Sequence, residues 1–126
     1  MIKKYFVIFT ALFLAVYMGS YCFAADELSG NIENGIRIVE VKAFRYKFEP
    51  DPIVVKLADK VRLVVTSADV NHGMAISEFK VNVTIPAGKT STVEFIADKK
   101  GVFNAYCSVY CGSGHGNMKG RFIVKE

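Results

Sequence analysis

The sequence lacks the motifs of the common nucleotide-dependent and hydrolytic enzymes. No glycine-rich phosphate loop opens a helix, and no Gly-x-Ser-x-Gly element is present. Ser108 and Ser113 lack a separate histidine that could act as their general base. Tryptophan is absent, and the 126 residues include only two histidines and three cysteines. Any chemistry must therefore come from a small number of side chains.

The chain also has little net charge. The formal charge is +4 at pH 7, and loss of residues 1–24 would remove Lys3 and Lys4 and leave +2. A nucleic-acid-binding domain normally concentrates basic residues on one face. The only local basic run, Lys99-Lys100, is typical of a turn at a solvated edge. We therefore expect no nucleic-acid partner.

The first 24 residues have the pattern of an export signal. A short basic start precedes an apolar run over residues 5–18 that is interrupted only by Thr10, and small residues lead to Ala24. This pattern predicts a signal peptide cleaved after Ala24. The alternative is an uncleaved membrane anchor, because residues 5–25 carry no charge and about 20 apolar residues cross a bilayer.

Both alternatives place the rest of the chain in the periplasm or on the outer face of the cytoplasmic membrane, and the membrane is a partner only if the segment is uncleaved. Cys22 follows Tyr21, where a lipoprotein signal requires a small residue, so we do not expect lipidation.

Residues 25–35 are polar and aperiodic and predict a linker, whereas residues 36–126 predict one domain. Short β-rich runs are separated by turns rich in Pro, Gly, Asn and Asp. The runs are residues 36–46, 53–57, 61–66, 80–85, 90–96, 102–106 and 120–125. No sustained helical period follows residue 25, so the pattern predicts an antiparallel sandwich or barrel. In such a fold the corner at residues 68–74 can meet residues 107–118.

Four soft or borderline metal-binding side chains fall within twelve residues, and a fifth lies upstream. They are Cys107, Cys111, His115 and Met118, with His72 before them. A disulfide is the ordinary state of two cysteines in an exported protein, and Cys2His2 is a possible zinc site. Neither alternative uses Met118, whereas a weak thioether ligand beside His and Cys is typical of copper electron-transfer sites. A structural zinc or a disulfide therefore remains an alternative to copper.

The second thiolate distinguishes two kinds of copper site. A mononuclear blue-copper site needs one cysteine, two histidines and a methionine. Two thiolates four positions apart can instead each bridge two copper ions, with one imidazole left for each ion. Sharing of one electron between two metals keeps the geometric change on reduction small, which favours fast electron transfer.

The spacing Cys107-x3-Cys111-x3-His115-x2-Met118 resembles the binuclear CuA site of cytochrome c oxidase subunit II, and nitrous oxide reductase carries a similar site. The resemblance extends over residues 38–126, with residues 44–53, 67–73 and 120–126 as supporting segments. It implies an all-β fold, the cupredoxin Greek-key β-sandwich.

The resemblance implies two copper ions and a role for each ligand. Cys107 and Cys111 would bridge the ions, and His72 and His115 would bind one ion each. Met118 would be a weak ligand of one copper, and the backbone carbonyl of Val109 would be that of the other. In addition, Asp69 would help to shape the corner before His72, and the glycines at 112, 114 and 116 would let the loop fold tightly.

The implied function is transfer of single electrons by a subunit that is not catalytic on its own. Electrons would come from a cytochrome c-like donor and pass to subunit I of a haem-copper terminal oxidase. The alternative is a free-standing periplasmic CuA electron carrier or copper-delivery protein.

The sequence departs from the mitochondrial-type oxidases at three points. Val109 replaces a glutamate that reaches a magnesium ion at the border with subunit I. Residues 44–48, without tryptophan, replace a Trp-Tyr-rich segment that receives electrons. The chain has one N-terminal apolar segment where those larger proteins have two transmembrane helices, and in this it resembles the short, single-anchored subunit II of the B-type oxidases.

Overall fold

The computed structural model describes residues 27–126, so the predicted signal peptide or anchor, residues 1–24, lies outside the described residues. The regular secondary structure of the described residues is ten β-strands and two single-turn 3-10 helices. The strands are β1 (Asn31–Glu33), β2 (Ile36–Phe44), β3 (Lys47–Glu49), β4 (Ile53–Lys56), β5 (Lys60–Ser67), β6 (His72–Ile76), β7 (Val81–Ile85), β8 (Thr90–Ile96), β9 (Gly101–Tyr106) and β10 (Lys119–Lys125). The 3-10 helices are η1 (Ser77–Phe79) and η2 (His115–Asn117).

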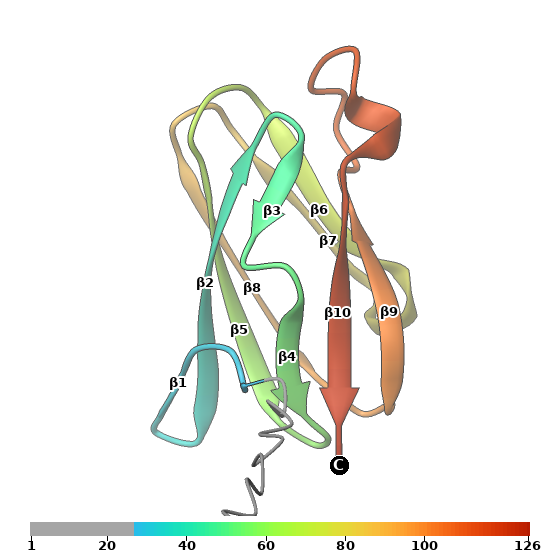
Figure 1. Ribbon diagram of the computed structural model, residues 1–126. Helices are drawn as coiled ribbons and strands as arrows, with labels where there is room; N and C mark the ends of the chain where they lie inside the picture. The colour runs from blue at the N-terminus through green and yellow to red at the C-terminus, as the bar shows by residue number, and fades with distance from the viewer. Residues whose placement is uncertain (1–26) are drawn as a thin grey trace, which may run out of the picture.

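The strands form two packed sheets (Figure 1). One has the order β1-β2-β5-β8, with β3 paired to β2, and the other has the order β4-β10-β9-β6-β7. Residues point alternately to the core and to solvent, as along β5, where Val61, Leu63 and Val65 are fully buried. The prediction of an all-β sandwich of the cupredoxin type is confirmed.

The expectation of a purely antiparallel arrangement is wrong for two strand pairs. β2 pairs with β5 in parallel, and β10 pairs with β4 in parallel. A parallel pair normally needs a long crossover, often a helix. Here the chain between β2 and β5 supplies that crossover by adding β4 to the opposite sheet, so no helix is required.

All seven predicted runs correspond to strands, and three strands add to them. Two of the added strands, β1 and β3, are only three residues long. β1 falls inside the segment for which the sequence predicts a linker, and the preceding Ser29 donates its amide to the carbonyl of Val54 at 2.7 Å. The described part of that segment therefore pairs with both sheets.

Aromatic side chains fill the core between the sheets. Phe79 lies at the centre, with ring centroids 5.5 Å from Phe95, 5.0 Å from Phe103 and 5.5 Å from Phe122. Phe103 belongs to β9 and Phe122 to β10, which pair with each other in antiparallel register. The core thus fixes the two strands that flank residues 107–118.

Residues 107–118, named the ligand loop from here on, lie at one end of the sandwich, and β1 and the C-terminus lie at the other (Figure 1). Within residues 27–126, no helix is long and apolar enough to cross a bilayer.

Candidate metal centre

The ligand loop is closed by backbone hydrogen bonds at its base and within its second half. The amide of Cys107 donates to the carbonyl of Met118 at 3.0 Å, directly beyond the last pair of the β9–β10 ladder. The short helix η2 is held by the amide of His115, which donates to Gly112 at 3.1 Å, and by that of Asn117, which donates to Gly114 at 3.0 Å. These bonds turn the loop back on itself, so its sulfur and imidazole groups converge.

Three buried sulfur atoms and the imidazole nitrogen of the half-buried His115 form a cluster in the loop. The Sγ atoms of Cys107 and Cys111 are 3.5 Å apart, and Met118 Sδ lies 3.7 Å from Cys111 Sγ. His115 Nδ1 lies 3.6 Å from Cys111 Sγ. Both cysteines are buried free thiols, since a disulfide bond would hold the sulfurs at about 2 Å. The structure therefore contains no disulfide between these residues.

His72 reaches the cluster from the first residue of β6. Its side chain is fully buried, and its Nδ1 atom lies 3.8 Å from Cys107 Sγ. The candidate ligand atoms of His72, Cys107 and Cys111 all lie within 4.8 Å of one another. The predicted meeting of the 68–74 corner with the ligand loop is thus present in the fold.

The carbonyl group of Val109 completes the set of predicted ligands. Its oxygen accepts a hydrogen bond from Cys107 Sγ at 3.1 Å. The structure brings together all six residues that the sequence singles out. They are His72, Cys107, Val109, Cys111, His115 and Met118.

Asp69 orients the buried imidazole. Its Oδ1 atom lies 2.6 Å from Nε2 of His72, so the ring donates there and turns the Nδ1 lone pair toward Cys107. The other carboxylate oxygen accepts the backbone amide of Arg45 at 2.8 Å. Partial burial by itself raises the pKa of Asp69, but the amides of Arg45 and Val70 and the His72 ring outweigh it and lower that pKa to about 2. Asp69 is therefore a carboxylate at neutral pH.

The Cys111 thiol is less acidic than a free thiol. Burial and the hydrogen bond with Cys107 raise the pKa of Cys111 to about 11. A thiol with this pKa is protonated at neutral pH. A metal that binds it as a thiolate must displace that proton.

Close packing around glycines holds the ligand loop in place. A Cβ atom at Gly73 would lie 2.2 Å from Ser108 Oγ and 2.9 Å from the amide nitrogen of Val109. Gly112, which has φ +135°, and Gly114 pack against the ring of Tyr46 in the β2–β3 turn. Only a residue without a side chain allows these approaches. By contrast, a Cβ at Gly116 would meet nothing within 4 Å, so this predicted glycine is not needed for packing.

Sequence reasoning missed several residues that support the loop. Tyr46 covers two of its glycines, and Asn82 of β7 accepts a hydrogen bond from the Ser108 hydroxyl at 2.8 Å. Neither residue is near the loop in sequence, so no local pattern identifies them. Gly73 could have been found, because a glycine directly after a candidate ligand is a common sign of close backbone approach.

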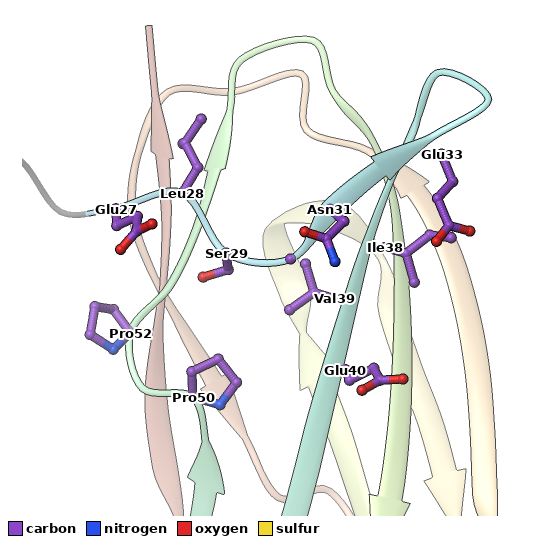
Figure 2. A pocket seen from close by; sticks show the side chains of 11 residues that line it. Glu27, Leu28, Ser29, Asn31, Glu33, Ile38, Val39, Glu40, Pro50 and Pro52 are labelled. Atoms are coloured by element: carbon purple, nitrogen blue, oxygen red, sulfur yellow. The ribbon is translucent and has the colours of Figure 1, made fainter.

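The largest cavities do not mark the cluster. One of about 490 Å³ lies between the N-terminal segment, β2 and the β3–β4 connection (Figure 2). Its lining includes Glu27, Glu33, Glu40, Pro50 and Pro52, and none of the six predicted ligands. A smaller cavity of about 450 Å³ does reach the cluster, because Cys107, His115 and Met118 line it.

The donor set fits copper better than zinc. Zinc sites in proteins use thiolate, imidazole and carboxylate groups and gain nothing from a thioether. Met118 is fully buried with its sulfur against Cys111, where it takes part in the cluster. Thiolate, imidazole and a weak thioether together are the ligands of copper electron-transfer sites.

Comparisons with known proteins agree with this geometry. The family model for the periplasmic domain of cytochrome c oxidase subunit II matches residues 13–125. Cytochrome c oxidase subunit 2 of Thermus thermophilus is 38% identical over 88 residues, which are 70% of this chain and 65% of that protein. Nitrous-oxide reductase of Cupriavidus necator is 34% identical over 102 residues, 77% of this chain and 16% of that protein. The chain thus spans less than two thirds of the length of these relatives.

Solved structures share the fold. The periplasmic domain of subunit II of cytochrome oxidase from Bradyrhizobium japonicum matches with a TM-score of 0.65 and 23% sequence identity, over 71% of this chain and 83% of that one. This likeness identifies the fold of the described residues.

Proposed function

We propose, from the premise that this chain belongs to the family of cytochrome c oxidase subunit II periplasmic domains, that it is a binuclear-copper electron-transfer domain. The family and the cluster of His72, Cys107 and Cys111 support copper binding, and the periplasmic family supports an exported protein. The observation that carries the proposal is the pair of free thiols 3.5 Å apart, each with an imidazole nitrogen within 4 Å.

Each predicted ligand has a place in the proposed site. Cys107 and Cys111 would bridge two copper ions, with His72 on one ion and His115 on the other. Met118 and the Val109 carbonyl would be weak ligands. When bound, the copper pair supplies a centre that takes up and releases one electron at a time.

The chain's own contribution is to keep these ligand groups in fixed positions and shielded from water. Four of the six residues are buried, and the ligand loop is fixed by its base, by η2 and by its contacts with Tyr46 and Gly73. Asp69 fixes the ring of His72. A site held in this way changes little in shape when its charge changes, so electron transfer needs little rearrangement.

We further propose that the electrons come from a cytochrome c-like donor and go to subunit I of a haem-copper oxidase. The free-standing carrier or copper-delivery protein remains the alternative. The two are distinguished by purification of the full chain from its native membranes and periplasm. Co-purification with a haem protein supports the oxidase subunit, whereas recovery from the periplasm without haem supports the alternative.

Electron paramagnetic resonance of the copper-loaded full chain tests the binuclear site. We expect two copper ions per chain and a hyperfine pattern from one electron shared by two copper nuclei. Cys111→Ser removes a bridge and should abolish that pattern. Asn117→Ala, an exposed position on the same loop, should retain it. A one-copper pattern in the unmodified chain would refute the binuclear proposal.

A further inference from the structure

The end of the sandwich that carries the ligand loop has a marked excess of positive charge. Four segments form this end, which is called the ligand-loop face. They are residues 44–47, 67–71, 86–89 and 107–119. Together they carry four cations and one carboxylate, namely Arg45, Lys47, Lys89, Lys119 and Asp69.

Contacts between the segments bring them together at one end of the sandwich. Tyr46, next to Lys47, packs against Gly114 of the ligand loop. The amide of Ser67 donates to the carbonyl of Lys89 at 3.0 Å, which joins the second segment to the third. Lys119 directly follows the last residue of the ligand loop. All four segments lie at the same end in Figure 1.

The single carboxylate does not neutralise the face. Asp69 is directed toward His72 and the amide of Arg45, and its remaining ion-pair contact is with Arg45 Nε at 3.6 Å. Lys47, Lys89 and Lys119 are exposed, and in the described part of the chain no ion pair involves them. Three ammonium groups without an ion pair are therefore carried by the segments at the end of the sandwich that holds the candidate copper site.

The opposite end of the sandwich differs, because its charges are largely paired with one another. Lys99 pairs with Asp98 at 3.4 Å, and Lys100 pairs with Glu126 at 2.8 Å. Glu27 and Glu33 add negative charge there. The excess of cations over carboxylates on the ligand-loop face thus contrasts with the mixed charges of the opposite end, even though the net charge of the chain is small.

An exposed aromatic group lies within the basic face. Tyr110 is 75% exposed, and its ring centroid is 5.6 Å from that of the half-buried His115. A bulky apolar side chain with charged groups around it is the composition of a protein docking surface, where the charges steer the partner and the centre excludes water.

We propose that the ligand-loop face docks an electron-donor protein whose redox centre is surrounded by carboxylates. This inference rests on the proposed function and adds the charge type of the donor. In the step itself, one electron leaves the ferrous haem of the donor, which becomes ferric, and enters the copper-loaded site of this chain. No bond forms and no proton moves.

Opposite charges raise the association rate of such partners by about 10- to 1,000-fold at low salt, and salt removes the advantage. The test uses a reduced basic cytochrome c and the same protein with its lysines succinylated, which makes it acidic. Stopped-flow reduction of the copper-loaded full chain is followed with both probes as ionic strength increases. We expect the rate with the acidic probe to fall at least about tenfold and the rate with the basic probe to rise.

Matched variants locate the effect. Lys47→Gln and Lys119→Gln should each lower the low-salt rate with the acidic probe several-fold. Lys56→Gln makes the same charge change at the exposed end of β4, away from the ligand loop, and should leave that rate unchanged. A faster reaction with the basic probe at low salt, or equal effects of all three variants, would overturn the proposal.

Two further measurements separate this inference from its alternatives. A neutral ferrocene alcohol reduces an accessible copper site whatever the surface charge. If it fails to reduce the loaded chain, the proposed function fails. If it succeeds while the salt dependence has the wrong sign, only the docking inference fails. If Lys119→Gln weakens retention on phosphatidylglycerol vesicles but changes neither cytochrome rate, the face meets lipid and the donor proposal is wrong.

Discussion

The two ends of the sandwich are held together by different interactions. At the end away from the ligand loop, Arg37 is 6% exposed and its guanidinium pairs with Asp59. The same guanidinium donates to the carbonyl of Ser29 at 3.1 Å, and Asp59 also accepts the amide of Lys56 at 2.9 Å. This buried network ties the segment before β1 to the turn that precedes β5.

The ligand-loop end depends instead on close backbone approach and on the placement of one imidazole. Its buried polar contacts are between His72 and Asp69 and between the Ser67 hydroxyl and the Val70 carbonyl, and the loop is also held by close glycine packing and loop hydrogen bonds. Changes at the Arg37 end should alter folding stability with little effect on copper, and changes at the ligand-loop end should alter copper binding first.

The largest effect on stability is expected for Arg37→Met. Loss of the guanidinium leaves Asp59 as a largely buried charge without its partner, which typically costs about 3–5 kcal/mol. Asp59 keeps some contact with water, so we expect the lower part of that range. Urea unfolding of the metal-free full chain measures the change in free energy of unfolding. The spectrum of the copper-loaded variant should match that of the copper-loaded unmodified chain.

Arg62→Met is the control for this change. Arg62 pairs with Glu94 at 2.6 Å on the same sheet, but about a third of each side chain is exposed. Exposed pairs contribute about 0–1 kcal/mol. If the two arginine variants lose equal stability, burial of the Arg37 pair is not what distinguishes the two ends.

The next largest effect is expected at Gly73, on the ligand-loop side. Alanine there places a Cβ against the Ser108 hydroxyl and the Val109 backbone, so the loop must shift away from β6. We expect copper affinity to fall at least about tenfold, equivalent to about 1.4 kcal/mol. Competition with a copper chelator measures the affinity.

Gly116→Ala tests the same loop without the steric conflict, because a Cβ at that position has open space. Its copper affinity should match that of the unmodified chain. Equal losses for the Gly73 and Gly116 variants would mean that loop flexibility, and not the close approach to β6, controls binding.

The strands that the sequence predicted are those with strong alternation or valine-rich runs. Strand β6 was missed, because its sequence His72-Gly73-Met74-Ala75-Ile76 carries a histidine and a glycine where a strand pattern needs apolar alternation. All five residues are buried, since β6 lies between β7 and β9 and beneath the ligand loop. Burial on both faces removes the period-two pattern that identifies a strand.

The candidate site was easier to predict than its surroundings. Five of its six residues have side chains of unusual type, and four of these lie within twelve residues of sequence, so local spacing was enough. The supporting contacts of Arg45, Tyr46 and Asn82 are long-range and use common residue types. The excess charge of the ligand-loop face was hidden for the same reason, since its lysines are distributed over separate segments.

Asp69→Asn tests the polar contact that the ligand-loop end does contain. The pKa of Asp69 is lowered to about 2 in the folded protein from an ordinary value of 3.8. Its contribution to stability is therefore present above pH 4 and is lost as the pH falls toward 2. Asparagine cannot titrate, so the metal-free variant should lack that loss, on the order of 1 kcal/mol, when unfolding is measured from pH 5 to pH 2.

The smallest effect is expected on the reduction potential of the copper-loaded variant. A carboxylate behind His72 stabilises the more positive, oxidised site, so replacing Asp69 with asparagine should raise the potential. A tenfold change in a one-electron equilibrium is about 59 mV, and we expect a rise of roughly 20–60 mV by protein-film voltammetry. Asp98→Asn removes the same charge at the opposite end and should leave the potential unchanged. A rise of equal size in both variants would mean that the potential responds to overall charge, and the distinct role of Asp69 at the ligand-loop end would be lost.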